Sequence, residues 1–266
     1  MAVRRRLDAE LVHRGLARSR EVAVDLIHQE RVLVQGTVAT KPARQVQADD
    51  SIVVRTDDND PGYASRGGYK LAGALDAFEE LQVANRRCLD AGASTGGFTD
   101  VLLRRGAAQV VAADVGYGLL SWSLRNDDRV DVKDRTNVRS LTPELIGGSV
   151  DVVVADLSFI ALGIVLPALS SCLVDDGDLL VMVKPQFEVG KQRLGAGGVV
   201  RDPALRESAV LQVAHEAAAL GWGTAGVVAS SLPGPSGNVE YFLWLRRDAK
   251  PPNRDDVATA VREGPQ

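Results

Sequence analysis

The chain has 266 residues, a formal net charge of −4, 45 % hydrophobic residues and 25 % charged residues. These values are typical of a globular α/β protein, and the longest apolar stretch, 160–174, is too short to span a bilayer and contains a proline. Two cysteines and three scattered histidines exclude a disulfide framework and a zinc site. Arginines 4–6 precede no apolar run, so we expect a cytoplasmic protein without a signal peptide, a metal or a membrane partner.

Charge is unevenly distributed along the chain. Residues 1–48 contain nine basic and five acidic residues, which gives +4 there and −8 in the remainder. A basic segment attached to an acidic body is typical of a polyanion-binding module, although a solvated helix face with scattered arginines is the simpler interpretation.

The N-terminal 60 residues predict a small α+β domain. Two short helices over 7–14 and 19–29 are joined at Gly15, with Ser19 as the expected N-cap of the second. Strands follow over 32–38, where the run includes a tight turn, and over 51–54. The polar, turn-rich segment after residue 56 predicts a linker over about 57–64.

From residue 65 to 248, helical and strand patterns alternate. The seven predicted strands cover residues 87–90, 110–114, 130–133, 150–155, 179–183, 227–229 and 241–245. Helices are predicted over about 68–81, 97–105, 161–173 and 203–220. This alternation indicates a doubly wound, mostly parallel sheet with ligands at the carboxyl ends of its strands. Residues 249–266 are expected to form a polar helix or a frayed tail.

A glycine-rich turn joins the first predicted strand of this sheet to a helix. Its cofactor-binding candidates are Asp90, Gly92, Ser94, Gly96, Gly97 and Phe98, joined by Asp114 and Val115 after the next strand. A dinucleotide fingerprint requires glycine where Ser94 stands, whereas S-adenosylmethionine has no phosphate that the backbone must approach. An acid at position 114 could accept the ribose hydroxyls. The alternatives are a plain tight connection and a hydrolase nucleophile elbow, for which the only late histidine lies inside a helix.

Four charged residues lie at predicted element ends around this turn. Asp156 and Lys184 each end a strand, Glu240 begins the last strand, and Lys70 lies on the preceding helix. Two amines and two carboxylates in one cleft can shift each other's pKa and handle protons. The competing interpretation is two ordinary surface ion pairs.

Several motifs carry a resemblance to a known family. The segments 65–71 (SRGGYKL), 90–99 (DAGASTGGFT), 155–159 (ADLSF) and 183–188 (VKPQFE) resemble the FtsJ-like ribose 2′-O-methyltransferases, in the branch named TlyA or haemolysin A. Residues 11–20 and 32–36 resemble an S-four-type RNA-binding module. The linker residues Pro61-Gly62-Tyr63-Ala64 depart from the arginine–tryptophan segment expected in close relatives.

The resemblance implies a Rossmann-like class I methyltransferase with a Lys70-Asp156-Lys184-Glu240 tetrad, S-adenosylmethionine as cofactor, and cytidine 2′-hydroxyls of 16S and 23S ribosomal RNA as substrates. Lys184 is then the candidate general base. The basic module would grip RNA phosphates of ribosomal subunits. Its candidates are Arg4, Arg5, Arg6, Arg14, Arg18, Arg20, Lys41 and Arg44. Alternatives are a non-catalytic RNA-binding or ribosome assembly factor and, more distantly, a membrane-lytic protein, for which no long cationic amphipathic segment is present.

Overall fold

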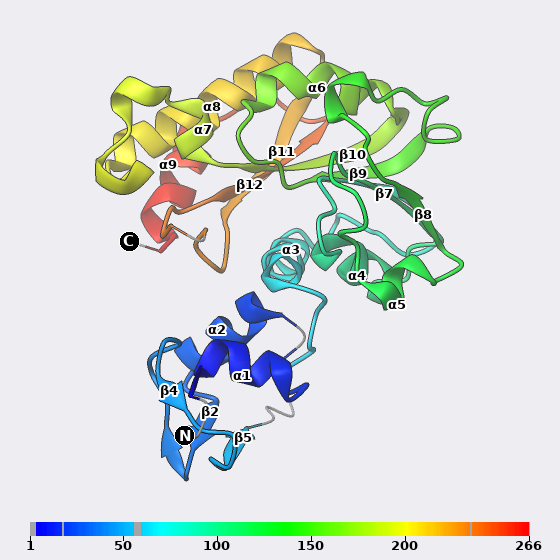
Figure 1. Cartoon of the computed structure of the whole chain (residues 1–266). Coiled ribbons are helices and arrows are strands. Elements are labelled where there is room, and N and C mark those ends of the chain that lie inside the picture. Colours follow the sequence, from blue (N-terminus) through cyan, green and yellow to red (C-terminus); the bar gives the residue numbers. More distant parts are fainter. Residues whose placement is uncertain (1–3, 18, 56–59, 235, 266) are drawn as a thin grey trace. The chain divides into compact units, whose positions relative to one another are not determined.

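The computed structural model describes residues 4–17, 19–55, 60–234 and 236–265. The chain divides into two compact units, Met1–Gly62 and Tyr63–Gln266 (Figure 1). Two expectations fall outside the described residues: Arg18, and the 57–59 part of the predicted linker.

The first unit combines two helices with two small antiparallel sheets. Its elements are β1 (Arg5–Arg6), α1 (Leu7–His13), α2 (Arg20–His28), β2 (Val32–Val34), β3 (Thr37–Val38), β4 (Gln45–Val46) and β5 (Ile52–Val54). As expected, the Ser19 hydroxyl caps α2 by accepting from the backbone N–H of Val22 at 3.2 Å. Gln35 and Gly36 both have positive φ, which gives the β2–β3 hairpin the strand-matched two-residue turn. A small core beneath the helices includes Leu7, Leu11, Ala23, Ile27, Val32 and Val34.

The second unit is a seven-stranded sheet in the order β11-β12-β10-β9-β6-β7-β8. The strands are β6 (Arg87–Ala91), β7 (Gln109–Ala113), β8 (Val130–Lys133), β9 (Val150–Ala155), β10 (Leu173–Val183), β11 (Gly223–Ala229) and β12 (Tyr241–Arg246). The five strands from β10 to β8 are parallel, and β12 is antiparallel to both β10 and β11. The predicted mostly parallel, seven-stranded sheet is therefore confirmed.

Helices cover both faces of this sheet (Figure 1). They are α3 (Arg66–Ala77), α4 (Gly97–Arg104), α5 (Trp122–Arg125), α6 (Leu162–Ser171), α7 (Pro185–Glu188), α8 (Pro203–Ala219) and α9 (Arg254–Glu263), with three-residue 3₁₀ turns at 138–140, 191–193 and 196–198. Side chains of α3 and α4 share one buried cluster, and those of α6, α8 and α9 share the other. Residues from Val152 to Ala155 of β9 alternate between the two clusters, which explains why the strand is apolar apart from Asp151.

Two elements extend further than expected. Strand β10 begins at Leu173 rather than 179, because its acidic first half continues alongside β9 with a register shift before Asp178. The C-terminal segment contains α9, whose Val257, Ala260 and Val261 are buried against the sheet. Three apolar residues on one face were too few to distinguish this helix from a frayed tail.

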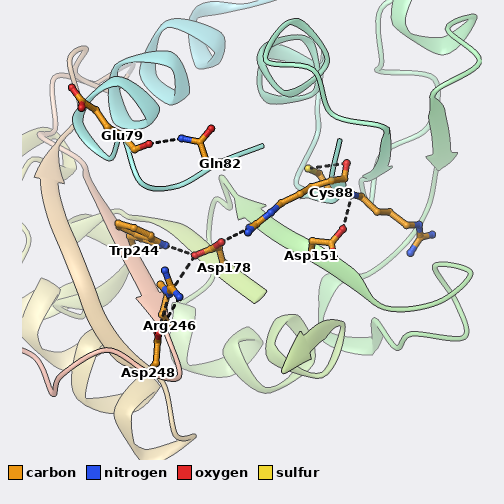
Figure 2. Close-up of polar contacts among 10 residues, drawn as sticks. Glu79, Gln82, Cys88, Asp151, Asp178, Trp244, Arg246 and Asp248 are labelled. Atoms are coloured by element: carbon orange, nitrogen blue, oxygen red, sulfur yellow. Dashed lines mark hydrogen bonds and ion pairs between the residues drawn. The ribbon is translucent and has the colours of Figure 1, made fainter. Parts of the chain in front are cut away.

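The buried carboxylate of Asp178 in β10 connects this strand to β12 and to the residue that precedes β6 (Figure 2). Asp178 accepts from Trp244 Nε1 at 2.8 Å and from Arg86 Nη1 at 2.5 Å. Both cysteines are buried, and burial raises the pKa of Cys88 to about 12. Across the described residues, no helix has the length and apolar character needed to cross a membrane.

Candidate active site

The glycine-rich turn follows β6 and runs into α4. Gly92, Ser94 and Gly96 all have positive φ (88°, 48° and 97°), so the turn needs residues that tolerate the left-handed region. A Cβ at Gly92 would lie 2.5 Å from the carbonyl oxygen of Asp156, and one at Gly97 would collide with Ser65. The small residues therefore allow β9 and α3 to approach the turn closely.

An acid at the end of β7 fixes this turn to the neighbouring loop. Asp114 Oδ2 accepts from the backbone N–H of Ser94 at 2.9 Å, and its Oδ1 accepts from that of Gly116 at 2.7 Å. The Asp114 carboxylate is half-buried. It thus orders both loops that border the carboxyl ends of β6 and β7.

Beneath the turn lies a second, fully buried acid. Asp90 Oδ2 accepts from Thr99 Oγ1 at 2.7 Å, while its Oδ1 is buried without a hydrogen-bond partner. Burial, together with the nearby charges of Asp156 and Asp114, raises the pKa of Asp90 to about 7. Three carboxyl groups therefore surround the glycine-rich turn.

Two other predicted cofactor residues have contrasting positions. The Phe98 ring is buried in the core and stacks at 6.0 Å from the Phe242 ring, so it packs beneath the turn rather than into the cleft. The Val115 side chain is 72 % exposed in the loop after β7.

Lys70 and Glu240 form a buried ion pair. Lys70 Nζ lies 2.5 Å from Glu240 Oε2, and their side chains are 8 % and 1 % exposed. A Cβ at Gly234 would lie 2.6 Å from Glu240 Oε1, so the preceding loop closes over the carboxylate. Residue 234 was not among the predicted site residues, and the turn sequence around it was its only signal.

Lys184 and Asp156 form a second, more accessible pair. Lys184 Nζ lies 2.5 Å from Asp156 Oδ1, with side-chain exposures of 10 % and 23 %. Lys184 Nζ also donates to Ser158 Oγ at 3.0 Å. Ser158 lies in a motif that the sequence singled out, yet nothing in one sequence marked its hydroxyl as the lysine's partner.

Sheet register brings the two pairs to the same end of the sheet. Val183 of β10 pairs with Tyr241 of β12, and these residues directly adjoin Lys184 and Glu240. Asp156 follows the last residue of the adjacent strand β9. The four predicted tetrad residues therefore gather around one edge, where Asp156 also borders the glycine-rich turn.

Exposed aromatic side chains line the loops at this edge. Phe159 is 90 % exposed with φ 63°, and Tyr117 is 68 % exposed beneath the guanidinium of Arg135. The Phe159 ring centroid lies 5.2 Å from that of Phe187, three residues after Lys184. Phe159 ends the 155–159 motif that the sequence singled out, but neither it nor Tyr117 was among the predicted site residues.

The predicted RNA-binding residues of the first unit differ in accessibility. Arg4, Arg5, Arg6, Arg20 and Lys41 are exposed, while Arg44 and Arg14 are half-buried. Arg14 Nε donates to Glu10 at 2.8 Å, and its Nη atoms donate to the backbone carbonyls of Asp50, Gln47 and Ala48 at 2.7–3.1 Å. RNA binding by Arg14 stays a prediction, and in the structure its guanidinium ties α1 to the 47–50 turn.

In the strand order of the sheet, the antiparallel strand β12 lies between β10 and β11, and a glycine-rich turn follows the central strand β6. This arrangement defines a class I methyltransferase fold. Residues 63–247 match the family of FtsJ-like methyltransferases, and residues 5–52 match the S4 domain. The chain belongs to the FtsJ-like methyltransferase family, and it is a methyltransferase with an N-terminal S4 domain.

Similar proteins cover nearly the whole chain. A Mycobacterium tuberculosis protein named 16S/23S rRNA (cytidine-2′-O)-methyltransferase TlyA is 60 % identical over 270 residues, which is 100 % of both chains. A Campylobacter jejuni protein named 23S rRNA (cytidine-2′-O)-methyltransferase TlyA is 30 % identical, covering 88 % of this chain and 96 % of its own. The solved structure of a Streptococcus thermophilus protein assigned as a hemolysin has a TM-score of 0.76 at 34 % identity, covering 99 % and 98 % of the two chains.

Proposed function

We propose that this enzyme transfers a methyl group from S-adenosylmethionine to the 2′-hydroxyl of cytidine in 16S and 23S ribosomal RNA. The observation that carries the proposal is the gathering of two amine–carboxylate pairs beside the glycine-rich turn. The full-length similarity to a protein named for this reaction supports the choice of substrate. In this proposal, Met1–Gly62 binds RNA and Tyr63–Gln266 carries the chemistry.

The residues around the turn suit a cationic nucleoside cofactor. Asp114 and Asp156 lie close enough to Asp90 for their charges to raise its pKa, and these two carboxylates disfavour a pyrophosphate and favour a cation. S-adenosylmethionine supplies a methyl group on a positively charged sulfur. Asp114 at the end of β7 would hold the ribose, and the backbone of 92–97 would border the rest of the cofactor. The exposed Val115 provides an apolar contact beside them.

Lys184 is the proposed general base. Its partner Asp156 is 23 % exposed, whereas Glu240 beside Lys70 is 1 % exposed, and Asp156 and Ser158 hold the Lys184 amine in position. An amine in its neutral form can accept the proton of the ribose 2′-hydroxyl at this point. Lys70 is paired with Glu240, so this second pair positions the neighbouring side of the site without adding net charge. Alignment of the attacking oxygen supplies much of the acceleration.

The surroundings of Lys184 suit a nucleotide that has left its helix. RNA is read mainly at unpaired, splayed bases that stack on aromatic side chains. Phe159 and Tyr117 project from loops at the same sheet edge, and both are largely exposed. Their exposure supports an RNA substrate over a small-molecule one.

Transfer of labelled methyl groups to unmodified 23S ribosomal RNA tests the proposal. We expect Lys184→Ala and Lys184→Arg to reduce transfer at least about 100-fold, since a guanidinium cannot be deprotonated in a protein. Cofactor affinity, measured by calorimetry, should change little. A matched control is Lys133→Ala, which removes a half-buried surface lysine paired with Asp131 at 3.1 Å.

Two outcomes would contradict the proposal in different ways. Turnover of Lys184→Arg at the wild-type rate would remove Lys184 as the base. RNA binding by the wild-type enzyme without any methyl transfer would instead favour a non-catalytic ribosome assembly factor.

A further inference from the structure

A buried carboxylate in the first unit gathers two arginines that are otherwise exposed. Asp8 is 2 % exposed. Its Oδ1 accepts from Arg6 Nε at 3.1 Å, and its Oδ2 accepts from Arg6 Nη2 and Arg20 Nη2, both at 2.9 Å. The side chains of Arg6 and Arg20 are 47 % and 62 % exposed. One buried oxygen therefore holds two guanidinium groups side by side at the surface.

The arrangement leaves donors available on both arginines. A guanidinium carries five N–H groups, and the contacts with Asp8 use two from Arg6 and one from Arg20. Without a carboxylate between them, two adjacent cations would repel each other and separate. The hydrogen bonds from these arginines also hold the pKa of Asp8 well below its usual value, so the anion persists at neutral pH.

A second buried acid in the same helix provides an internal comparison. Glu10 is 4 % exposed and pairs with Arg14 at 2.8 Å and Arg5 at 3.4 Å. Arg14, however, donates three of its four remaining N–H groups to backbone carbonyls of the 47–50 turn. The Glu10 pair thus supports the fold, whereas the Asp8 pair faces solvent.

We propose that Asp8 is a positioning residue for RNA binding. Its carboxylate holds Arg6 and Arg20 as a two-arginine clamp whose remaining N–H groups bind a backbone phosphate of RNA. Paired guanidinium donors match the geometry of phosphate oxygens. This inference rests on the proposed function, because it assumes that the first unit binds ribosomal RNA.

The test asks whether Asp8→Asn increases or decreases the affinity for RNA. Asp8→Asn removes a negative charge from an RNA-binding unit, so long-range electrostatics alone predicts tighter binding. If Asp8 orients the two arginines, the same substitution weakens binding to in vitro transcribed 23S ribosomal RNA, by about 3- to 10-fold at constant salt. The slope of log affinity against log salt concentration should also become shallower, by the amount that about one phosphate contact contributes.

Three further variants test whether Asp8 acts by positioning Arg6 and Arg20 or only through its charge. Glu10→Gln is the matched control, and it should bind RNA as tightly as the wild-type enzyme or slightly more tightly. Arg20→Lys retains the charge at a largely exposed position and should weaken binding about 3-fold or more. In an Arg6→Ala/Arg20→Ala background, Asp8→Asn should no longer weaken binding, since the groups it positions are gone.

Folding of each variant is checked by circular dichroism before binding is measured. If Asp8→Asn does not fold, Arg20→Lys decides the question, because the Arg20 side chain is 62 % exposed and the substitution keeps its charge. Wild-type affinity in Arg20→Lys, or in folded Asp8→Asn, would overturn the clamp. Failure of the wild-type enzyme to bind or methylate the RNA would instead reject the proposed function itself.

Discussion

The buried Lys70–Glu240 pair allows stability and catalysis to be measured separately. Its two charged atoms lie 2.5 Å apart, and neither side chain is more than 8 % exposed. Removing one partner of such a pair leaves a buried charge without compensation and costs about 3–5 kcal/mol, whereas replacing both by neutral groups is often close to neutral. We therefore expect Glu240→Gln and Lys70→Met to be strongly destabilising, and the double variant to recover to within about 1 kcal/mol of the wild-type enzyme.

Tryptophan fluorescence provides the assay. The three tryptophans, Trp122, Trp222 and Trp244, all lie in the second unit, so their signal reports the unfolding of that unit alone. In a unit of this size, 1 kcal/mol shifts Tm by about 2–4 °C, so each single variant should melt about 6–20 °C lower. The half-buried surface pair Lys133–Asp131 is the control, and its disruption should cost no more than about 1 kcal/mol.

Activity of the double variant completes the cycle. If the pair serves catalysis, the double variant should be stable and yet transfer methyl groups at least about 100-fold more slowly. A double variant whose loss of stability equals the sum of the two single losses would show that the two charges are not coupled. A double variant with wild-type turnover would show that the pair is structural, and the proposed tetrad would then reduce to Lys184 and Asp156.

Two other predictions concern buried polar groups. Burial raises the pKa of Asp90 to about 7 from the value of 3.8 in the unfolded chain, so the folded state keeps a proton that the unfolded chain loses. The unfolding free energy of the second unit should consequently fall as pH rises from 4 to 8. In denaturant titrations, Asp90→Asn should make this pH dependence weaker. The dependence that remains should come from Glu188, whose pKa burial also raises to about 7. Wild-type and Asp90→Asn enzymes with equal slopes would contradict this assignment. Arg14→Lys should destabilise the first unit by about 2–3 kcal/mol, because the hydrogen bonds to backbone carbonyls are lost. Hydrogen exchange of the α1 amides measures this loss, and unchanged exchange would contradict the structural role of Arg14.

The fold was predictable because the sheet is buried on both faces. Central strands such as β9 then become apolar runs that a sequence reveals directly. Elements stabilised by few apolar residues were not predictable in the same way. Strands β1 and β4 have only two residues each, and the start of β10 is acidic. Their pairing is decided by the rest of the fold rather than by their own composition.

The site was predictable only where it coincides with strand ends. Asp156, Lys184 and Glu240 adjoin β9, β10 and β12, so strand assignment alone brought them together. The partner of each group was not predictable, because Lys70 and Glu240 are 170 residues apart and nothing local links them. Phe98 was placed in the cofactor site by its position in the motif, but the direction of its side chain depends on the packing of α4 against Phe242.

The first unit shows why counting basic residues does not identify an RNA-binding surface. Arg6, Arg14 and Arg20 are equivalent in a charge count, yet each is paired with a buried acid whose position decides its role. Glu10 and three carbonyls occupy Arg14, whereas Asp8 gathers Arg6 and Arg20 while leaving their donors exposed. Affinity for a polyanion therefore depends on which arginines the fold leaves accessible, and on the anions that orient them. For this reason, removing the negative charge of Asp8 is expected to weaken RNA binding rather than strengthen it.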